Sequence, residues 1–169
     1  MKNARKEVGK YLGTFTARGQ VSENDSEQGR PERIRLFDGR FDTAFKVKEF
    51  YIWGANAAGS SNPDVSGKLA TSPNVESATD FFNADDGREI AWGSVAGSTD
   101  TFFNSPPGSI IDPENLVVED LFVFVRSPID PGAVNYLIVM DKYDITETLG
   151  AVSMAKDRAR DSANEWMNP

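Results

Sequence analysis

The side chains that could do chemistry in this chain are carboxylates, lysines, hydroxyls and aromatic rings, because it contains neither cysteine nor histidine. Without them the chain cannot build a thiol nucleophile, a Ser–His–Asp or Cys–His arrangement, or a zinc site with thiolate or imidazole ligands. The usual general acid–base group near neutral pH is missing as well. The composition therefore points away from an enzyme, and no cofactor or metal is expected.

One cluster of acids surrounds a glycine in the segment 83–89, NADDGRE. Carboxylate and carbonyl oxygens of this kind could hold Ca²⁺, but the alternating acids of an EF-hand loop are absent. The alternative is a type I turn in which Arg88 pairs with a neighbouring acid. We favour the turn, and the sequence leaves open whether Asp85 and Asp86 bind an ion.

Two adjacent carboxylates, Glu119 and Asp120, interrupt the most apolar segment of the chain. Successive strand side chains point to opposite faces, so at least one of them should meet a covered surface and need a partner there. The covered carboxylate could be one member of a catalytic acid pair like those of glycosidases. It could instead be bound by an arginine or lie at a subunit contact. Because no second carboxylate at a defined distance is identifiable, we expect a structural contact.

Two serine–lysine pairs are close enough in sequence to be considered as dyads. They are Ser66 with Lys68, and Ser153 with Lys156 on the expected helix. A lysine acts as a base only where a dry pocket lowers its pKa, and nothing in the sequence indicates such a pocket. We therefore assign no catalytic role to either pair.

Paired phenylalanines occur in two loop-rich segments, as Phe81-Phe82 and Phe102-Phe103. They could plug the open ends of a sandwich, line a glycan-binding face, or contact a neighbouring subunit. Most other aromatic residues, Phe41 among them, lie in strand patterns and are expected in the core.

Alternating apolar residues predict the elements that position these groups. Strands are expected over residues 11–18, 32–37, 40–53, 65–71, 89–95, 116–126 and 134–143. Asp38-Gly39 predicts a two-residue hairpin. The apolar face of the third strand switches at Glu49, which predicts a bulge near Lys48–Glu49. The apolar strand 116–126 is expected to be central and to pair with 134–143.

These elements predict an all-β fold, an antiparallel β-sandwich with one C-terminal helix. Unequal connections favour a single jelly roll over an immunoglobulin-like sandwich, whose Cys…Trp…Cys landmark is absent. We expect a basic N-terminal arm over 1–10, the sandwich over 11–144 and the helix over 145–166, capped by Asp144 or Thr146. The apolar stripe of the helix is thin, so a partner chain could complete it.

Charge is distributed unevenly along the chain. Residues 1–48 hold eleven Lys/Arg and seven Asp/Glu, a balance of +4, and the total of −8 leaves −12 for residues 49–169. An acidic body disfavours nucleic-acid binding and confines any such contact to the N-terminal arm. The apolar runs are far shorter than the roughly 20 residues of a membrane helix, so no membrane span is expected.

Three segments carry a resemblance to a known class of proteins. The sequences DGREIAWGS (86–94), IDPENLVVEDLF (111–122) and NYLIVM (135–140), the last followed by a charged helix, resemble small virion proteins of environmental, chiefly aquatic, viruses. The resemblance covers about residues 40–162 and implies a single jelly-roll capsid or minor-capsid subunit. The resemblance implies no catalytic residue in this chain. The strongly basic terminal arm of many viral coats is absent, which argues against direct genome packaging.

We therefore expect a non-enzymatic structural subunit of a virus particle, located in the virion. Its partners would be copies of itself and other virion proteins. The expected contact residues are Lys6, Lys10, Phe81, Phe82, Phe102, Phe103, Glu119, Asp120, Val152 and Trp166. The alternative is a carbohydrate- or receptor-binding β-sandwich module with aromatic loops as its contact surface, and an acid-pair hydrolase ranks last.

Overall fold

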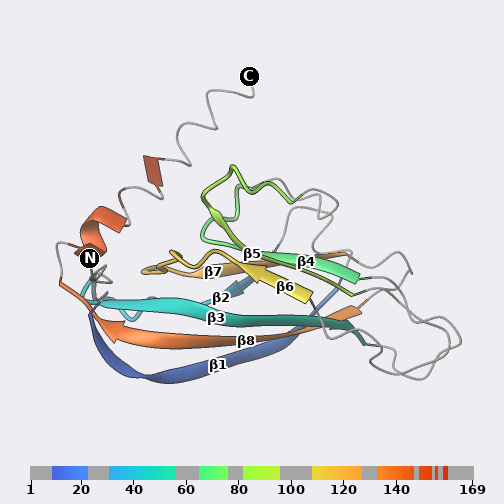
Figure 1. Cartoon of the computed structure of the whole chain (residues 1–169), viewed down its shortest axis with the longest axis horizontal. Helices are drawn as coiled ribbons and strands as arrows, with labels where there is room; N and C mark the ends of the chain where they lie inside the picture. Colours follow the sequence, from blue (N-terminus) through green and yellow to red (C-terminus); the bar gives the residue numbers. More distant parts are fainter. Residues whose placement is uncertain are drawn as a thin grey trace, which may run out of the picture.

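The structure, a computed structural model, describes residues 9–22, 31–55, 65–75, 82–95, 108–126, 133–146, 149–153, 155 and 158–159. Its strands are β1 (Lys10–Ser22), β2 (Glu32–Ile34), β3 (Thr43–Gly54), β4 (Val65–Ala70), β5 (Glu89–Val95), β6 (Gly108–Ile111), β7 (Leu121–Arg126) and β8 (Ala133–Asp144). They form two antiparallel sheets, as the sequence predicts (Figure 1). Sheet A has the order β1-β8-β3, and sheet B the order β2-β7-β4-β5-β6. A short helix follows β8, with helical residues at 149–153, 155 and 158–159.

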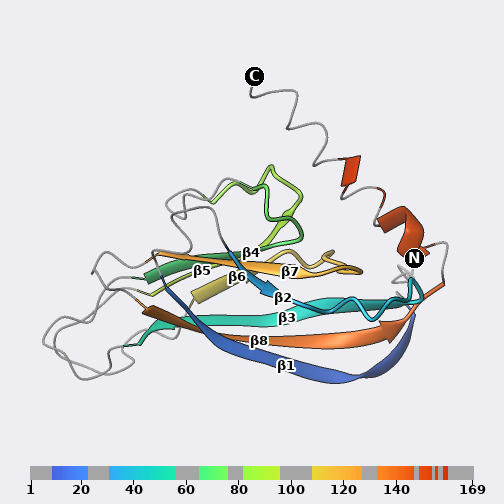
Figure 2. The same cartoon turned by 180° about the vertical axis from the view of Figure 1, so that it is seen from behind.

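The core lies between the two sheets. Phe50, Ile52, Ile138 and Met140 from sheet A meet Leu69, Leu121 and Val123 from sheet B, and all are almost completely buried. Along β8, buried residues alternate with partly exposed ones, because no described strand or helix covers the outer face of sheet A. Strands β4 and β7 are buried at nearly every position. Figure 2 shows the described parts of the chain between β4 and β5, residues 71–75 and 82–88, arching over the outer face of sheet B, which explains that burial.

The bulge predicted near Lys48–Glu49 is confirmed. The β3–β8 register shifts between Val47 and Glu49, which leaves Lys48 as the extra residue. Val47 and Phe50 therefore both face the core, although an odd number of positions separates them. The parity change in the sequence is the direct result of this extra residue.

The hairpin predicted at Asp38-Gly39 is wrong. Strand β2 pairs with β7 in sheet B, whereas β3 pairs with β8 in sheet A. The segment 35–42 is therefore a connection from one sheet to the other. Gly39 has a φ of +86°, a conformation that glycine adopts without a steric penalty in turns of many kinds, hairpin or not.

The pairing predicted between 116–126 and 134–143 is also wrong. Strand β7 starts only at Leu121 and lies in sheet B between β2 and β4, while β8 is the central strand of sheet A. The segment before β7 contacts sheet A instead, because Val117 forms a bridge with Phe45 of β3. Apolar character on both faces predicted a central strand correctly but could not identify its neighbours.

Strand ends gather at two opposite ends of the molecule. Lys10, Thr43 and Asp144 lie side by side in the register of sheet A, next to the short helix, and we call this the helix end. It lies at the left of Figure 1, where β1 begins and the helix lies beside the ends of β3 and β8. At the opposite end, Ala133 and Val134 begin β8 beside the ends of β1 and β3.

Candidate interaction surface

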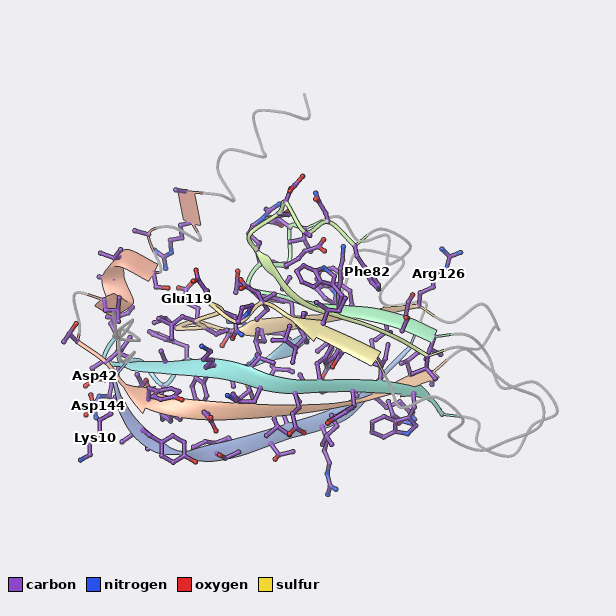
Figure 3. All side chains as sticks on the ribbon, in the orientation of Figure 1. Lys10, Asp42, Phe82, Glu119, Arg126 and Asp144 are labelled. Carbon is purple, nitrogen blue, oxygen red and sulfur yellow. The ribbon has the colours of Figure 1, made fainter. Side chains whose placement is uncertain are left out.

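The predicted contact residues do not converge on one site. Five of them, Lys6, Phe81, Phe102, Phe103 and Trp166, lie outside the described residues. Figure 3 shows Lys10 at the helix end beside Asp42 and Asp144, with Phe82 far from it on the sheet B side of the molecule. Phe82 and Val152 are both exposed. The structure therefore separates the residues that the sequence grouped together.

Asp120 is bonded within its own chain. Its carboxylate, 6% exposed, accepts hydrogen bonds from Arg33 Nε at 2.6 Å and from the backbone N–H groups of Leu36 and Phe37 at 2.9 and 3.2 Å. Burial opposes ionisation, but these bonds and the guanidinium charge outweigh it, and the pKa of Asp120 lies below its ordinary value. The arginine-bound carboxylate, one of the alternatives left open by the sequence, is the arrangement observed.

Glu119 points the other way, toward the short helix. Its Oε1 accepts a hydrogen bond from Arg158 Nη2 at 2.9 Å, and both side chains are exposed. Exposed pairs of this kind contribute little to stability. The contact nevertheless connects the segment before β7 to the helix.

A fully buried ion pair on the outer face of sheet B was missed by the sequence analysis. Lys68 Nζ lies 2.5 Å from Glu89 Oε1, and neither side chain is exposed. Glu89 Oε2 accepts hydrogen bonds from Trp92 Nε1 and from the backbone N–H of Asn83, at 2.8 and 3.0 Å. Breaking such a pair leaves an uncompensated buried charge. Lys68 therefore lies in the dry surroundings that a lysine base requires, which the sequence did not indicate. In those surroundings it forms an ion pair with the carboxylate of Glu89.

The acidic segment 83–89 forms the turn that we favoured. Backbone hydrogen bonds run from Asp86 N to Asn83 O and from Glu89 N to Asp86 O. Both carboxylate oxygens of Asp86 accept from the buried guanidinium of Arg88. Burial opposes ionisation of Asp86, yet the bonds from Arg88 keep its pKa below the ordinary value. Within the described ranges, no three Asp or Glu side chains gather as metal ligands.

The two edges of sheet A differ in how they are covered, and the edge on the β3 side is closed along its first half. Phe45 and Val117 exchange both backbone hydrogen bonds, at 2.7 and 2.8 Å. At Val47 the side chain of Asn115 takes the place of a strand, because its Oδ1 accepts from Val47 N at 2.7 Å and its Nδ2 donates to Val47 O at 3.2 Å. Asn115 is itself buried. The edge is therefore capped immediately before the bulge.

The edge on the β1 side has no strand beside it among the described residues. Strand β1 has thirteen residues and pairs with β8 along its whole length. On its other side it makes no backbone hydrogen bond to any residue in the described part of the chain. It contains no proline and no acidic residue, and its charged side chains are Lys10 and Arg18. A long open edge presents a row of donors and acceptors to another strand.

Exposed apolar side chains are concentrated in three elements, which are β1, the connection into β3 and the helix. The described residues include ten large apolar side chains that are exposed, and seven of them belong to β1, to the 35–42 connection or to the helix. These seven are Tyr11, Leu12, Phe15, Phe37, Phe41, Leu149 and Val152, and we call them the helix-end patch. An apolar group of this kind on a protein surface is typical of an interaction site.

Contacts connect three members of the helix-end patch, Phe15, Phe37 and Phe41. Lys142 Nζ lies 5.9 Å from the centre of the Phe15 ring and 3.4 Å from Asp38 Oδ2, and Asp38 adjoins Phe37. The rings of Phe37 and Phe41 are 5.3 Å apart. The core position expected for Phe41 is wrong, since 43% of it is exposed. It precedes β3 and lies in the connection between the sheets, not in a strand.

The described residues define an all-β protein of two antiparallel sheets, with one closed edge, one open edge and an apolar patch at one end. No helix in the described ranges has the length and apolar character to cross a membrane. No protein-family model, no curated protein and no solved structure matches the chain.

Proposed function

We propose that this protein is a non-enzymatic structural subunit that assembles with copies of itself, as a capsid shell or vertex component of a virus particle. One observation carries the proposal: no described residue pairs with the long outer edge of β1, which bears the exposed side chains of Tyr11, Leu12 and Phe15, whereas β3 is closed along its first half. Open edges are normally short, charged or covered in proteins that stay monomeric. The resemblance of residues 40–162 to small virion proteins points to the same role.

The proposed fold is a single jelly roll, and the strand order supports it. A jelly roll is a long antiparallel hairpin folded into two sheets, so its strands pair as first with eighth, second with seventh, third with sixth and fourth with fifth. Pairs β1–β8, β2–β7 and β4–β5 are hydrogen-bonded here. Strand β6 bonds to β5 instead of β3, but the chain that follows it reaches β3 at Val117. This bridge between Val117 and Phe45 stands in for the contact between the third and sixth strands.

The pairing of the carboxylates favours a structural role over an enzymatic one. The carboxylates of Asp86, which is partly buried, and of Glu89 and Asp120, which are buried, are each bonded to a cationic side chain of the same chain. A glycosidase-like mechanism needs two carboxyl groups facing a common substrate. Carboxylates committed to internal cations are poorly placed for that task.

The test is the assembly state of the full chain. Light scattering after size-exclusion chromatography, over a range of protein concentration and salt, should show oligomers that grow with concentration, and electron microscopy should show a discrete particle. Phe41→Ser, in the helix-end patch, should reduce assembly, while Trp53→Ser, an exposed aromatic at the other end of β3, should not. A chain that is monomeric at every concentration and salt contradicts the proposal.

The glycan- or receptor-binding module is the second candidate, and the exposed ring of Phe82 favours it. Exposed aromatic rings offer flat apolar faces to which ligands can bind. A glycan array decides between the two: binding that Phe82→Ala removes, in a chain that stays monomeric, would favour the module.

A further inference from the structure

We propose that two copies of the chain pair through β1, antiparallel and about a two-fold axis at Thr16, so that two copies of sheet A form one six-stranded sheet. The proposal rests on the self-assembly proposed above and names the first contact of that assembly. Strand addition at an open edge takes its affinity from backbone hydrogen bonds and its specificity from side chains. A two-fold contact uses the same surface on both copies.

The length of β1 selects the register. A two-fold axis at Thr16 pairs Lys10 with Ser22 of the second copy, so every residue of the strand has a partner. A two-fold register centred elsewhere leaves residues unpaired at both ends. Phe15 and Ala17 face the core side, opposite Met140 and Ile138, so the intervening Thr16 faces outward.

The charges favour the same register. It places Arg18 of the second copy opposite Thr14, and Thr14 lies opposite Asp141 on β8, to which its Oγ1 donates at 2.7 Å. Two strand spacings, about 10 Å, then separate Arg18 of one copy from Asp141 of the other on the same face. Extended arginine and aspartate side chains span that distance, and the symmetry forms the ion pair twice.

Arg18 is available for this contact. Its side chain is exposed and makes no ion pair with any described residue, and within one copy it lies opposite Leu137. Asp141 lies four positions further along β8, roughly 13 Å away. The pair can therefore form between copies but not within one.

Side chains on the core-facing side of β1 are also compatible with this register. Phe15, 48% exposed, would lie opposite Ala17 of the second copy, and Gly13 opposite Gly19. Small residues opposite the aromatic ring leave room for it. The join would cover part of the helix-end patch in both copies.

The register can be tested with single cysteines, because the chain has none of its own. In Thr16→Cys the two sulfurs would face each other across the axis, with Cα atoms about 4.5 to 5.5 Å apart, within the range of a disulfide. In Thr14→Cys the two Cα atoms would be roughly 13 Å apart. Mild oxidation should give a covalent dimer of Thr16→Cys and not of Thr14→Cys, as read by mass spectrometry. Equal cross-linking of both variants, or of neither, overturns the register.

The ion pair can be tested by charge exchange. Arg18→Glu alone and Asp141→Lys alone should each weaken dimerisation, because each places two like-charge pairs across the join, and a loss of at least about tenfold in affinity is expected. Mixing the two variants should restore dimerisation, since the mixed pair has both attractive contacts. A mixture no tighter than either variant alone contradicts the contact.

The outcomes separate this inference from the proposed function. If light scattering shows assembly but Thr16→Cys does not cross-link and mixing does not rescue, the β1 contact is wrong and self-assembly stands. If the unmodified chain is monomeric under all conditions, self-assembly itself has failed.

Discussion

The outer strands of sheet A, β1 and β3, are similar in length and both pair with β8. They differ in how the backbone groups on their outer edges are covered. Strand β3 is capped at Phe45 by the backbone of Val117 and at Val47 by the side-chain amide of Asn115. Strand β1 has no comparable cover among the described residues. This difference is the basis of our proposal that the chain covers part of the β3 edge itself and uses the β1 edge for assembly.

At Val47 the closed edge depends on one buried side chain from a distant part of the sequence, that of Asn115. Asn115 satisfies both the N–H and the C=O of Val47, which a neighbouring strand would otherwise satisfy. A third bond, from Nδ2 to Asp112 O at 2.5 Å, fixes the amide orientation. One asparagine therefore does locally what an additional strand would do.

The largest expected effect comes from opening the closed edge. Asn115→Ala leaves the N–H and C=O of Val47 buried without partners, and at about 1–3 kcal/mol for each group the free energy of unfolding should fall by about 2–6 kcal/mol. Urea denaturation measures the change. Asn135→Ala, an exposed amide on β8 that bonds to Gln20, is the matched control and should change it by less than about 0.5 kcal/mol. Equal effects would mean that Asn115 does not hold the edge.

A smaller effect is expected at Asp120, which holds the chain just after β2, the short edge strand of sheet B. Asp120→Asn removes the charge that binds Arg33 and should lower the free energy of unfolding by about 1–2 kcal/mol at pH 7.

The same variant carries a pH test. Because the folded-state pKa of Asp120 is depressed, its stabilising contribution is present above the unfolded pKa of about 3.9 and is lost as the pH falls through the folded value. Acidification from about pH 5 to pH 3 should therefore destabilise the variant less than the parent chain. Glu114→Gln, at an exposed position, is the control. Identical slopes for Asp120→Asn and the parent would contradict the assignment.

The smallest effect on stability should come from protecting the open edge. Thr16→Lys changes an exposed side chain, so the free energy of unfolding should change by less than about 0.5 kcal/mol. Its effect on association should be large by comparison, because two lysines would face each other at the axis. Light scattering of the variant and of Gln20→Lys, which lies away from the axis, measures this. Association of Thr16→Lys at the level of the parent chain would show that the axis lies elsewhere.

The sequence predicted what depends on local pattern. The parity change at Glu49 located the bulge, the buried acid at Asp120 was expected to need an arginine or a subunit, and Thr146, one of two predicted caps, accepts a hydrogen bond from Leu149 N through Oγ1 at 3.3 Å. A period of two identifies the faces of a strand but not its neighbours. The partners of β7 and β8 were therefore predicted wrongly.

The remaining errors involve contacts between residues far apart in the sequence. Lys68 and Glu89 lie in different strands, and each is an ordinary polar residue until the register brings them together under the chain that covers sheet B. Asn115 resembles a loop asparagine, and its role appears only once its segment lies along β3. Whether a strand edge is covered depends on such contacts, and local pattern does not encode them.

Hydrogen exchange of the full chain at low and at high protein concentration tests the central claim most directly. Amides on the open edge of β1 should exchange rapidly in dilute solution and become protected as the chain associates, while those around Phe45 and Val47 should be protected at both concentrations. Association without any gain of protection in β1, or with the gain confined to β3, would contradict the account.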